Sequence, residues 1–152
     1  MVLDYTKYDP CRKIYLSGTI TGADYAYANE WRGKIKDTIE EGTKYRWKCF
    51  NPMEHFNYDI VPEYGFTERE VMNYELNMLK KSDLVICRWD ANKSIGTACE
   101  LATAYNLGIP IIVFVEDPEL KIHPWIESMA EHIFTEWNYM MHYLAEHYLN
   151  EV

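Results

Sequence analysis

The pattern that decides the fold lies in residues 83–115, DLVICRWDANKSIGTACELATAYNLGIPIIVFV. Two short apolar runs, Asp83–Trp89 and Pro110–Val115, flank a stretch with helical periodicity from Ile95 to Leu107, which ends at Gly108. Strands that are apolar on both faces are typical of parallel sheets covered by helices. The segment therefore predicts two strands of such a sheet and the helix between them.

The same alternation of short apolar runs and helical patterns continues through the rest of the chain. Further strands are predicted at Ile14–Leu16, Tyr45–Phe50 and Ile133–Phe134, and further helices at about Asp24–Glu41, Thr67–Lys81 and Pro124–Glu131 and from Glu136 onwards. No repeat or linker interrupts this order, so we expect one domain over residues 1–152. The predicted fold class is α/β, a single flavodoxin-like domain with a five-stranded parallel sheet and helices on both faces.

The charge of the chain limits its partners. The formal net charge is −9 at pH 7, and a field of that sign repels nucleic-acid backbones and anionic membranes. There is no apolar run of about 18 residues and no signal-peptide pattern. The cysteines have no CxxC spacing, and Cys87 and Cys99 sit in apolar stretches that indicate buried thiols. We expect a cytoplasmic protein that binds neither polymeric nucleic acid nor membranes.

Ligands of flavodoxin-like sheets bind beyond the carboxyl ends of the strands. Three loops are expected there, Gly18–Gly22, Asn51–Phe66 and Asp90–Gly96. The second loop is long for a compact domain, which is typical of a binding loop. We expect it to line the pocket for a flat ligand, and the alternative is a solvent loop whose aromatic residues pack back on the protein. Those aromatic residues are Phe56, Tyr58 and Tyr64.

Glu100 is the only charged residue between Lys93 and Glu116. Its helix is apolar or small almost all round, which predicts a buried helix, and a lone buried carboxylate is unfavourable unless it has partners or a function. Glu100 also lies in the first turns of that helix, where the macrodipole favours the ionised form expected of a nucleophile. The alternative is a buried Glu held by a structural hydrogen bond.

Glu75 falls inside the apolar stripe of another predicted helix, formed by Val71, Tyr74, Met78 and Leu79. It is either a second functional carboxylate or a boundary residue whose carboxyl group reaches water. Two carboxylates near one sheet edge suit glycosidic chemistry. One attacks the anomeric carbon while the other hydrogen-bonds or protonates the leaving base.

Small and hydroxyl residues precede two of the predicted helices, in the turns Gly18–Gly22 and Ser94–Thr97. The N–H groups of such turns can receive an oxyanion or a sugar hydroxyl. Neither turn matches a P-loop or the GxGxxG fingerprint, and no set of His, Cys and Asp has metal-ligand spacing. We expect no metal and no organic cofactor. The residues expected to bind the substrate are Gly18, Thr19, Thr21, Gly22, Ser94, Gly96 and Thr97.

Together these segments resemble the nucleoside 2-deoxyribosyltransferase family. The resemblance covers about residues 13–134 and rests on YLSGTITG (15–22), Glu75 ahead of Ser82-Asp83, and SIGTACEL (94–101) followed by Gly108-Ile109-Pro110. It implies a covalent mechanism, in which Glu100 attacks the anomeric carbon, Tyr15 orients that carboxylate and Glu75 contacts the base. Many family members have Asp where this chain has Glu75. Capture of the deoxyribosyl-enzyme by a second base gives transfer, and capture by water gives hydrolysis.

The resemblance leaves two substrate classes open. Family members that act on free nucleosides often have Asp at the position of Ser94, whereas the branch that hydrolyses deoxynucleoside 5′-monophosphates has Ser, because Asp would repel a phosphate. That branch also tends to have Arg in the first loop, where this chain has Thr21. His123 falls where the family sends a residue from the neighbouring subunit to the sugar 5′ end. It is either that substrate-binding residue or a residue packed beside Pro124 and Trp125.

The sequence predicts an enzyme that cleaves the N-glycosidic bond of a 2′-deoxynucleoside through a covalent deoxyribosyl-Glu100 intermediate and transfers the sugar to another base. The first alternative is hydrolysis of a nucleoside 5′-monophosphate to free base and sugar phosphate. The second is a non-catalytic nucleotide-binding module, which would gain nothing from a buried acid beside Tyr15. A receiver-like domain is disfavoured because Gly18-Thr19-Ile20 replaces its acidic cluster. The family's shared active sites imply a homodimer or larger homo-oligomer.

Overall fold

The fold is built on a five-stranded sheet in the order β2-β1-β3-β4-β5, and every pair of neighbouring strands is parallel. The computed structural model describes residues 11–55 and 66–150. The strands are β1 (Arg12–Gly18), β2 (Trp47–Phe50), β3 (Leu84–Arg88), β4 (Ile111–Phe114) and β5 (His132–Phe134). This is the strand order of flavodoxin-like sheets, so the predicted fold class is confirmed.

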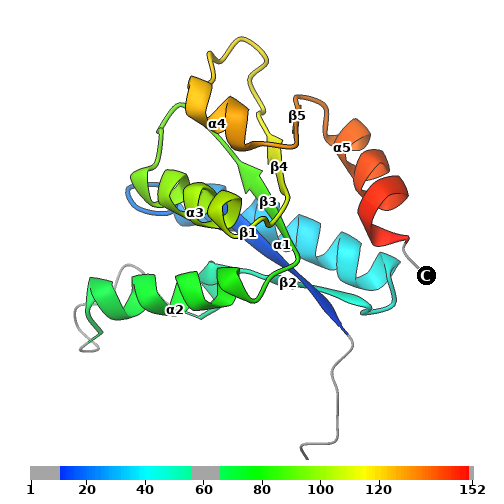
Figure 1. Ribbon diagram of the computed structural model, residues 1–152, viewed down its shortest axis with the longest axis horizontal. Helices are drawn as coiled ribbons and strands as arrows, with labels where there is room; N and C mark the ends of the chain where they lie inside the picture. The colour runs from blue at the N-terminus through cyan, green and yellow to red at the C-terminus, as the bar shows by residue number, and fades with distance from the viewer. Residues whose placement is uncertain (1–10, 56–65, 151–152) are drawn as a thin grey trace, which may run out of the picture.

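Helices cover both faces of the sheet. They are α1 (Tyr25–Gly42), α2 (Glu68–Lys80), α3 (Ile95–Asn106), α4 (Pro124–Met129) and α5 (Trp137–Leu144). A short 3-10 helix, η1 (Pro52–Glu54), follows β2, and α5 continues into a π-helical turn, η3 (Ala145–Leu149), which the sequence did not predict. Figure 1 shows α2, α3 and α4 on one side of the sheet and α1 and α5 on the other. None of the described helices is long and apolar enough to span a membrane.

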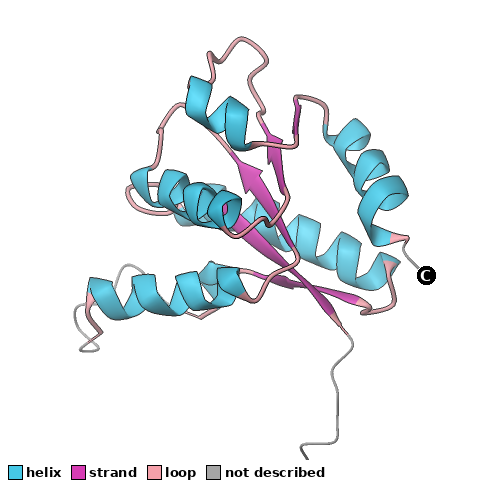
Figure 2. Ribbon diagram, in the orientation of Figure 1, coloured by secondary structure: helices cyan, strands magenta, loops and turns pink. Residues whose placement is uncertain are grey.

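Figure 2 shows helices on both sides of the sheet. A cluster of buried hydrophobic residues lies between the sheet and each of these two helical layers. Ile14 and Leu16 of β1 belong to the cluster formed with α1 and α5. Tyr15 belongs to the cluster formed with α2, α3 and α4. Side chains alternate between the two faces of a strand, so Ser17 lies on the same face as Tyr15. The face that packs against α2 and α3 therefore carries Tyr15 and Ser17, the two buried hydroxyl residues of β1.

Side-chain oxygens cap the N-termini of α2 and α3, two of the three helices on this face. The Thr67 hydroxyl accepts a hydrogen bond from the Glu70 N–H at 3.1 Å, which fixes the start of α2. The Ser94 hydroxyl accepts one from the Thr97 N–H at 3.2 Å, which fixes the start of α3. α3 follows β3 directly, so its N-terminus lies at the carboxyl edge of the sheet.

Two expectations about α3 are wrong. Cys99 is exposed, whereas Cys87 is buried as predicted. The helix is not buried all round, because Ile95 is 82% exposed and Tyr105 is 58% exposed. One side of α3 packs on the sheet, and part of the opposite side has no covering element among residues 11–55 and 66–150. The apolar residues of α3 therefore lie partly on an exposed surface and partly in the core. The buried residues of α3 are Thr97, Leu101 and Ala104.

Candidate active site

Glu100 meets the end of β1 through Ser17. The buried Ser17 hydroxyl donates a hydrogen bond to Oε1 of Glu100 at 3.1 Å. The two residues lie 83 positions apart in the chain. They meet because β1 pairs with β3, and α3 folds back across this pair. The contact, which the sequence did not predict, orients one carboxylate oxygen of Glu100.

Tyr15 lies beside the same carboxylate. Its side chain is fully buried, and its hydroxyl has no hydrogen bond of standard geometry with any described residue. Burial, followed by the negative charges of Glu100 and Glu75, raises the pKa of Tyr15 far above its usual range. Tyr15 is therefore a neutral phenol at all physiological pH values. The structure thus brings together the three residues expected to be catalytic, Tyr15, Glu75 and Glu100.

Both carboxyl groups are shifted toward the protonated form. Burial raises the pKa of Glu100 to about 7, although the hydroxyls of Tyr15 and Ser17 and the charge of Arg32 each act to lower it. Burial and the charge of Glu100 raise the pKa of Glu75 to about 8, against the lowering effect of Arg32. The sequence led us to expect that the α3 macrodipole would favour the ionised form of Glu100, whereas burial shifts its pKa toward the protonated form.

The coupling between the two acids separates the roles open to them. The charge of Glu100 adds to burial in raising the pKa of Glu75, so an ionised Glu100 favours a protonated Glu75. Pairs of carboxyl groups whose environments separate their pKa values are typical of acid and nucleophile pairs in enzymes. Such a pair can attack a carbon centre with one group and protonate the leaving group with the other.

A stack of aromatic rings continues from Tyr15 toward the end of β2. The Phe50 ring stacks on Tyr15 at a centroid distance of 5.3 Å, and His55 stacks on Phe50 at 5.0 Å. Tyr74, next to Glu75 in the chain, packs against both Phe50 and His55, and its hydroxyl lies 3.4 Å from Nδ1 of His55. Of the loop Asn51–Phe66, the aromatic residues Phe56, Tyr58 and Tyr64 lie outside the described residues.

Asp90 joins the first and third loops of the site. Its carboxylate accepts hydrogen bonds from the Thr19 hydroxyl at 2.9 Å and from the Tyr27 hydroxyl at 2.7 Å. It also accepts the N–H of Asn92 at 3.0 Å. The sequence did not predict a role for Asp90, although its position directly after a predicted strand was a signal for one. The hydroxyl of Thr19, expected to contact substrate, is engaged in this link.

The glycines of the first loop are required for different reasons. A Cβ on Gly18 would lie 2.9 Å from a ring carbon of Trp31, so the packing of α1 excludes any side chain there. Gly22 has a φ of 76°, a left-handed conformation that favours glycine, and a Cβ there would meet no atom. Thr21 is exposed. Packing against Trp31 explains Gly18 and backbone conformation explains Gly22, so neither glycine needs a ligand to account for it.

The third loop leads into the first turn of α3. Ser94 is half-buried and caps the helix, so its hydroxyl oxygen already accepts the Thr97 N–H. The Thr97 side chain is buried, and its hydroxyl has no hydrogen-bond partner among the described residues. A Cβ on Gly96 would lie 3.8 Å from the Ser94 hydroxyl oxygen, an ordinary contact. Packing therefore does not demand a glycine at position 96.

His123 lies on the exposed surface at the start of α4. Its Nδ1 accepts a hydrogen bond from the Trp125 N–H at 3.1 Å, so it caps that helix. It is neither buried nor packed into the core, and Trp125 beside it is 76% exposed. No described contact joins His123 to Glu100 or to the loop Gly18–Gly22.

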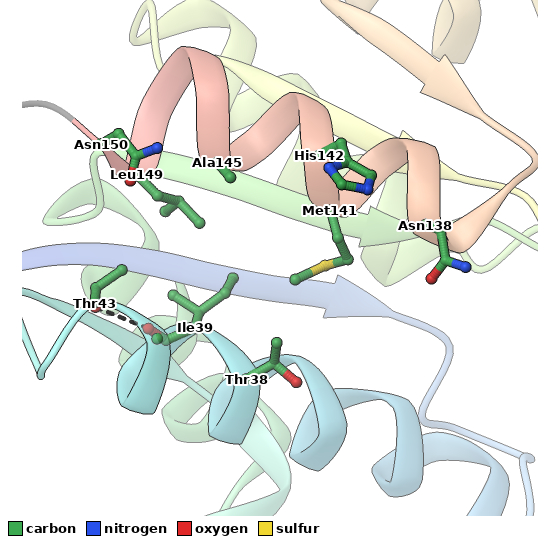
Figure 3. A pocket seen from close by; sticks show the side chains of 10 residues that line it. Thr38, Ile39, Thr43, Asn138, Met141, His142, Ala145, Leu149 and Asn150 are labelled. Carbon is green, nitrogen blue, oxygen red and sulfur yellow. Dashed lines mark hydrogen bonds between the residues drawn. The ribbon is translucent and has the colours of Figure 1, made fainter.

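Well-formed hollows exist elsewhere on the molecule. One of about 310 Å³ lies between α1 and the segment α5–η3, and side chains such as Ile39, Met141 and His142 line it (Figure 3). It is on the face of the sheet opposite Glu100 and contains no carboxylate among its lining residues. The chemistry therefore points to the α2/α3 face. Among residues 11–55 and 66–150, no group of three or more His, Cys, Asp or Glu is arranged to hold a metal ion.

Comparison with known proteins adds a family and several similar folds. The family described as a domain of unknown function (DUF4406) matches residues 12–113. No curated protein matches the chain. The 2-deoxyribosyltransferase of Bacillus psychrosaccharolyticus is similar in structure, with a TM-score of 0.64 and 25% identity over 84% of this chain and 89% of that chain. The predicted resemblance to the nucleoside 2-deoxyribosyltransferase family is thus confirmed.

Two further solved structures are similar at lower identity. A conserved protein from Enterococcus faecalis V583 has a TM-score of 0.72 and 15% identity, over 90% of this chain and 98% of that chain. The CMP N-glycosidase BcmB from Clostridium botulinum has a TM-score of 0.57 and 16% identity, over 89% of this chain and 98% of that chain. These two show the same fold.

Proposed function

The chain belongs to the family described as a domain of unknown function (DUF4406), and from its site we propose that it cleaves the N-glycosidic bond of a 2′-deoxynucleoside and transfers the sugar to another base. The observation that carries this proposal is the pair of half-buried carboxyl groups, Glu100 and Glu75, with pKa values raised to about 7 and about 8. The likeness to a 2-deoxyribosyltransferase supports it.

In the proposed reaction Glu100 is the nucleophile. Ser17 holds Oε1, so Oε2 attacks the anomeric carbon while the bond from that carbon to the base nitrogen breaks. Glu75 gives its proton to the departing base, and a deoxyribosyl ester on Glu100 remains. The ring nitrogen of a second base then attacks the anomeric carbon, the bond from that carbon to the Glu100 oxygen breaks, and the nitrogen gives its proton to Glu75, so both acids return to their starting states. The neutral Tyr15 hydroxyl stays beside the carboxylate through both steps and orients it.

The aromatic residues beside Glu75 are proposed to hold the base. His55 and Tyr74 are exposed and pack against each other, and the buried Phe50 ring packs against both. A planar base stacked against these rings would present its ring nitrogens to Glu75, the neighbour of Tyr74. Stacking on aromatic rings tolerates different bases, as a transferase with two base substrates requires.

Hydrolysis of a nucleoside 5′-monophosphate is the second candidate, supported by Ser94 and by the likeness in fold to a CMP N-glycosidase. In that case the N–H groups of Ile95 and Gly96 would receive the phosphate. Asp90 favours the nucleoside instead, because its carboxylate is hydrogen-bonded to Thr19 of the first loop and would repel a dianion between the two loops.

A non-catalytic nucleotide-binding module is disfavoured. Binding alone gains nothing from two buried acids, and keeping them raises the free energy of the folded protein when they ionise. The net charge of −9 likewise supports a small nucleoside over polymeric nucleic acid as the partner.

We propose that two copies of the chain share their active sites through the exposed side of α3 and α4. Ile95, Tyr105 and Trp125 are 82%, 58% and 76% exposed, and a hollow of about 370 Å³ lies between Tyr105 and Trp125. Apolar side chains gathered in this way are typical of subunit interfaces. His123 lies on the same surface, where it would reach the sugar 5′ end of the partner's substrate.

The test is a substrate panel. The purified protein is incubated with deoxynucleosides and with their 5′-monophosphates, each with and without a second free base, and the products are separated by chromatography. A new deoxynucleoside that forms only when the second base is present supports the transferase. Free base and sugar phosphate from the monophosphates alone would support the hydrolase instead, and substrate binding without any bond cleavage would support the binding module.

A further inference from the structure

Arg32 is a charged side chain of α1 with no exposure to solvent. Its Nε donates a hydrogen bond to the Leu16 carbonyl at 3.3 Å, and its two terminal nitrogens donate to the carbonyls of Gly18, at 2.9 Å, and Ala28. The guanidinium also lies 4.8 Å from the centre of the Trp31 ring. A buried charge is tolerated only when its polar atoms are satisfied, and these contacts satisfy them.

The position of Arg32 follows from an interruption in the sheet. β2 pairs with β1 only as far as Tyr15, whereas β3 pairs with β1 up to Gly18. The Lys13 carbonyl points toward β3, since it accepts the Asp83 N–H. Successive carbonyl groups of a strand point to alternate sides, so the carbonyl groups of the even-numbered residues of β1 point toward β2. The carbonyls of Leu16 and Gly18 therefore extend beyond the end of β2, and Arg32 takes the place of the missing strand.

This contact fixes the segment that holds Glu100. Ser17 lies between the two carbonyls that Arg32 binds, and its hydroxyl is the donor to Glu100. A planar guanidinium can bond both carbonyls at once, whereas a lysine ammonium is a single point charge on a flexible stem. Arg32 thus holds the backbone at Leu16–Gly18 from the α1 side of the sheet. The Ser17 side chain of the same segment bonds Glu100 on the α3 side.

Arg32 is also the cation that acts on the two acids. Its charge lowers the pKa of Glu100 and of Glu75 against the effect of burial. The groups that act on Arg32 itself are Glu100 from α3, Tyr15 from β1, and Cys87 and Arg88 from β3. Burial lowers the pKa of Arg32 to about 10, so it remains charged at neutral pH.

We propose that Arg32 is a positioning residue for the nucleophile: it holds the end of β1 so that Ser17 orients Glu100, and it supplies a buried positive charge that favours the ionised form of Glu100. The inference rests on the proposed function in assigning Glu100 as the nucleophile. Arg32 does not contact the space in which the substrate would lie, since it bonds the backbone from the opposite face of the sheet.

The test compares Arg32→Met and Arg32→Lys with a matched control, Arg88→Met. Arg88 is also buried, donates to the Tyr27 carbonyl at 2.6 Å and stacks on the Tyr27 ring, but it is not among the groups that shift the pKa of Glu100. The side-chain carboxyl carbon of Glu100 is titrated by ¹³C NMR, with Glu100→Gln used for assignment. Thermal unfolding and the pH dependence of base release are measured on the same proteins.

We expect Arg32→Met to raise the titration midpoint of Glu100 by about one pH unit, and to move the acid limb of base release upward by the same amount. Arg88→Met should lower the unfolding temperature comparably and leave the Glu100 midpoint in place. Arg32→Lys keeps the charge, so its midpoint should stay near that of the wild type while kcat falls by about tenfold with KM little changed.

The proposal would be overturned if the titration midpoint of Glu100 stayed in place in Arg32→Met. It would also be overturned if that midpoint moved by the same amount in Arg88→Met. If Arg32→Met does not fold, Arg32→Lys decides, and wild-type kcat in that variant would overturn the positioning role. The NMR titration needs no substrate. Failure of the proposed function, with no base released from any nucleoside, is therefore distinct from failure of this inference.

Discussion

The two faces of the sheet are buried alike and carry opposite charges. The face toward α2 and α3 holds Glu75 and Glu100, and the face toward α1 holds Arg32 and Arg88. Each face also has two buried polar atoms without a hydrogen bond in the described residues. Buried polar atoms without a hydrogen bond therefore do not distinguish the face with the candidate active site from the face toward α1. The distinction lies in the carboxyl groups, because the arginines are bonded to backbone carbonyls while the acids keep raised pKa values.

The buried polar atoms without a hydrogen bond also differ between the two faces. On the α1 face they are Nε1 of Trp31 and Nε of Arg88, both within groups of stacked cations and rings. On the α3 face they are the hydroxyls of Tyr15 and Thr97. Hydroxyls can donate and accept, and both are near Glu100 or the first turn of its helix. A ligand at this face would thus find partners already in place.

The sharpest test of the comparison removes the acid of the α3 face. Glu100→Gln should reduce base release by about a thousandfold or more, because the amide cannot form the ester intermediate. The unfolding temperature at pH 8 should stay the same or rise, since a buried ionisable group is replaced by a neutral one of the same shape. Chromatography and thermal unfolding check the two parts. Activity within about tenfold of wild type would remove Glu100 as the nucleophile.

A substitution on the α1 face should affect stability more than chemistry. Gly18→Ala places a Cβ 2.9 Å from the Trp31 ring, so we expect a loss of about 1–3 kcal/mol in the free energy of unfolding. Gly96→Ala is the matched control in α3, where the new Cβ makes only an ordinary contact at 3.8 Å. It should stabilise the fold by about 0.5–1 kcal/mol. Denaturant titration of both variants measures the difference, and equal losses would refute this packing argument.

The acids of the α3 face should also make stability fall as pH rises. Their pKa values are about 7 and about 8 in the folded protein, against 4.5 for the ordinary group. The unfolded chain therefore ionises first, and stability is lost between about pH 5 and pH 8. We expect the unfolding temperature to drop by several degrees over this range, and the slope to flatten in Glu75→Gln/Glu100→Gln. An equally steep slope in the double variant would place the titrating groups elsewhere.

The sequence predicted the fold because its hydrophobic periods are strong: β3 and β4 are apolar on both faces, and the helices between strands carry clear caps. It predicted Glu100 because a single charge in an apolar helix is conspicuous. It did not predict Ser17, Asp90 or Arg32, whose roles depend on contacts between segments far apart in the chain. Arg32 in particular resembles any polar residue of an amphipathic helix until the early end of β2 exposes the carbonyls that it binds.

The wrong assignment of Cys99 has a related cause. Its neighbours in the chain are apolar, but the side of α3 on which it lies is open. Composition cannot distinguish a helix buried in its own chain from one whose apolar side meets another subunit. The same ambiguity made the exposed Ile95 look like a core residue.

The smallest expected effect on a free deoxynucleoside is that of a substitution at Ser94, the N-cap of α3. Asp is as good an N-cap as Ser, so Ser94→Asp should keep the bond to the Thr97 N–H and change the unfolding temperature little. For a free deoxynucleoside, the new carboxylate can accept a hydrogen bond from the 5′-hydroxyl, and we expect kcat/KM to stay within about threefold of wild type or to rise. The measurement is kcat/KM for a deoxynucleoside and for its 5′-monophosphate, in wild type and variant.

For the monophosphate the same substitution acts through charge. A carboxylate a few ångströms from the dianion in a partly desolvated site should lower kcat/KM by about 30- to 1000-fold. If the enzyme is a nucleoside transferase, the wild-type ratio of nucleotide to nucleoside efficiency is already below one, since Asp90 disfavours phosphate between the loops. The variant then changes only a minor activity. A wild-type ratio well above one that inverts in Ser94→Asp would instead assign the protein to the nucleotide hydrolases.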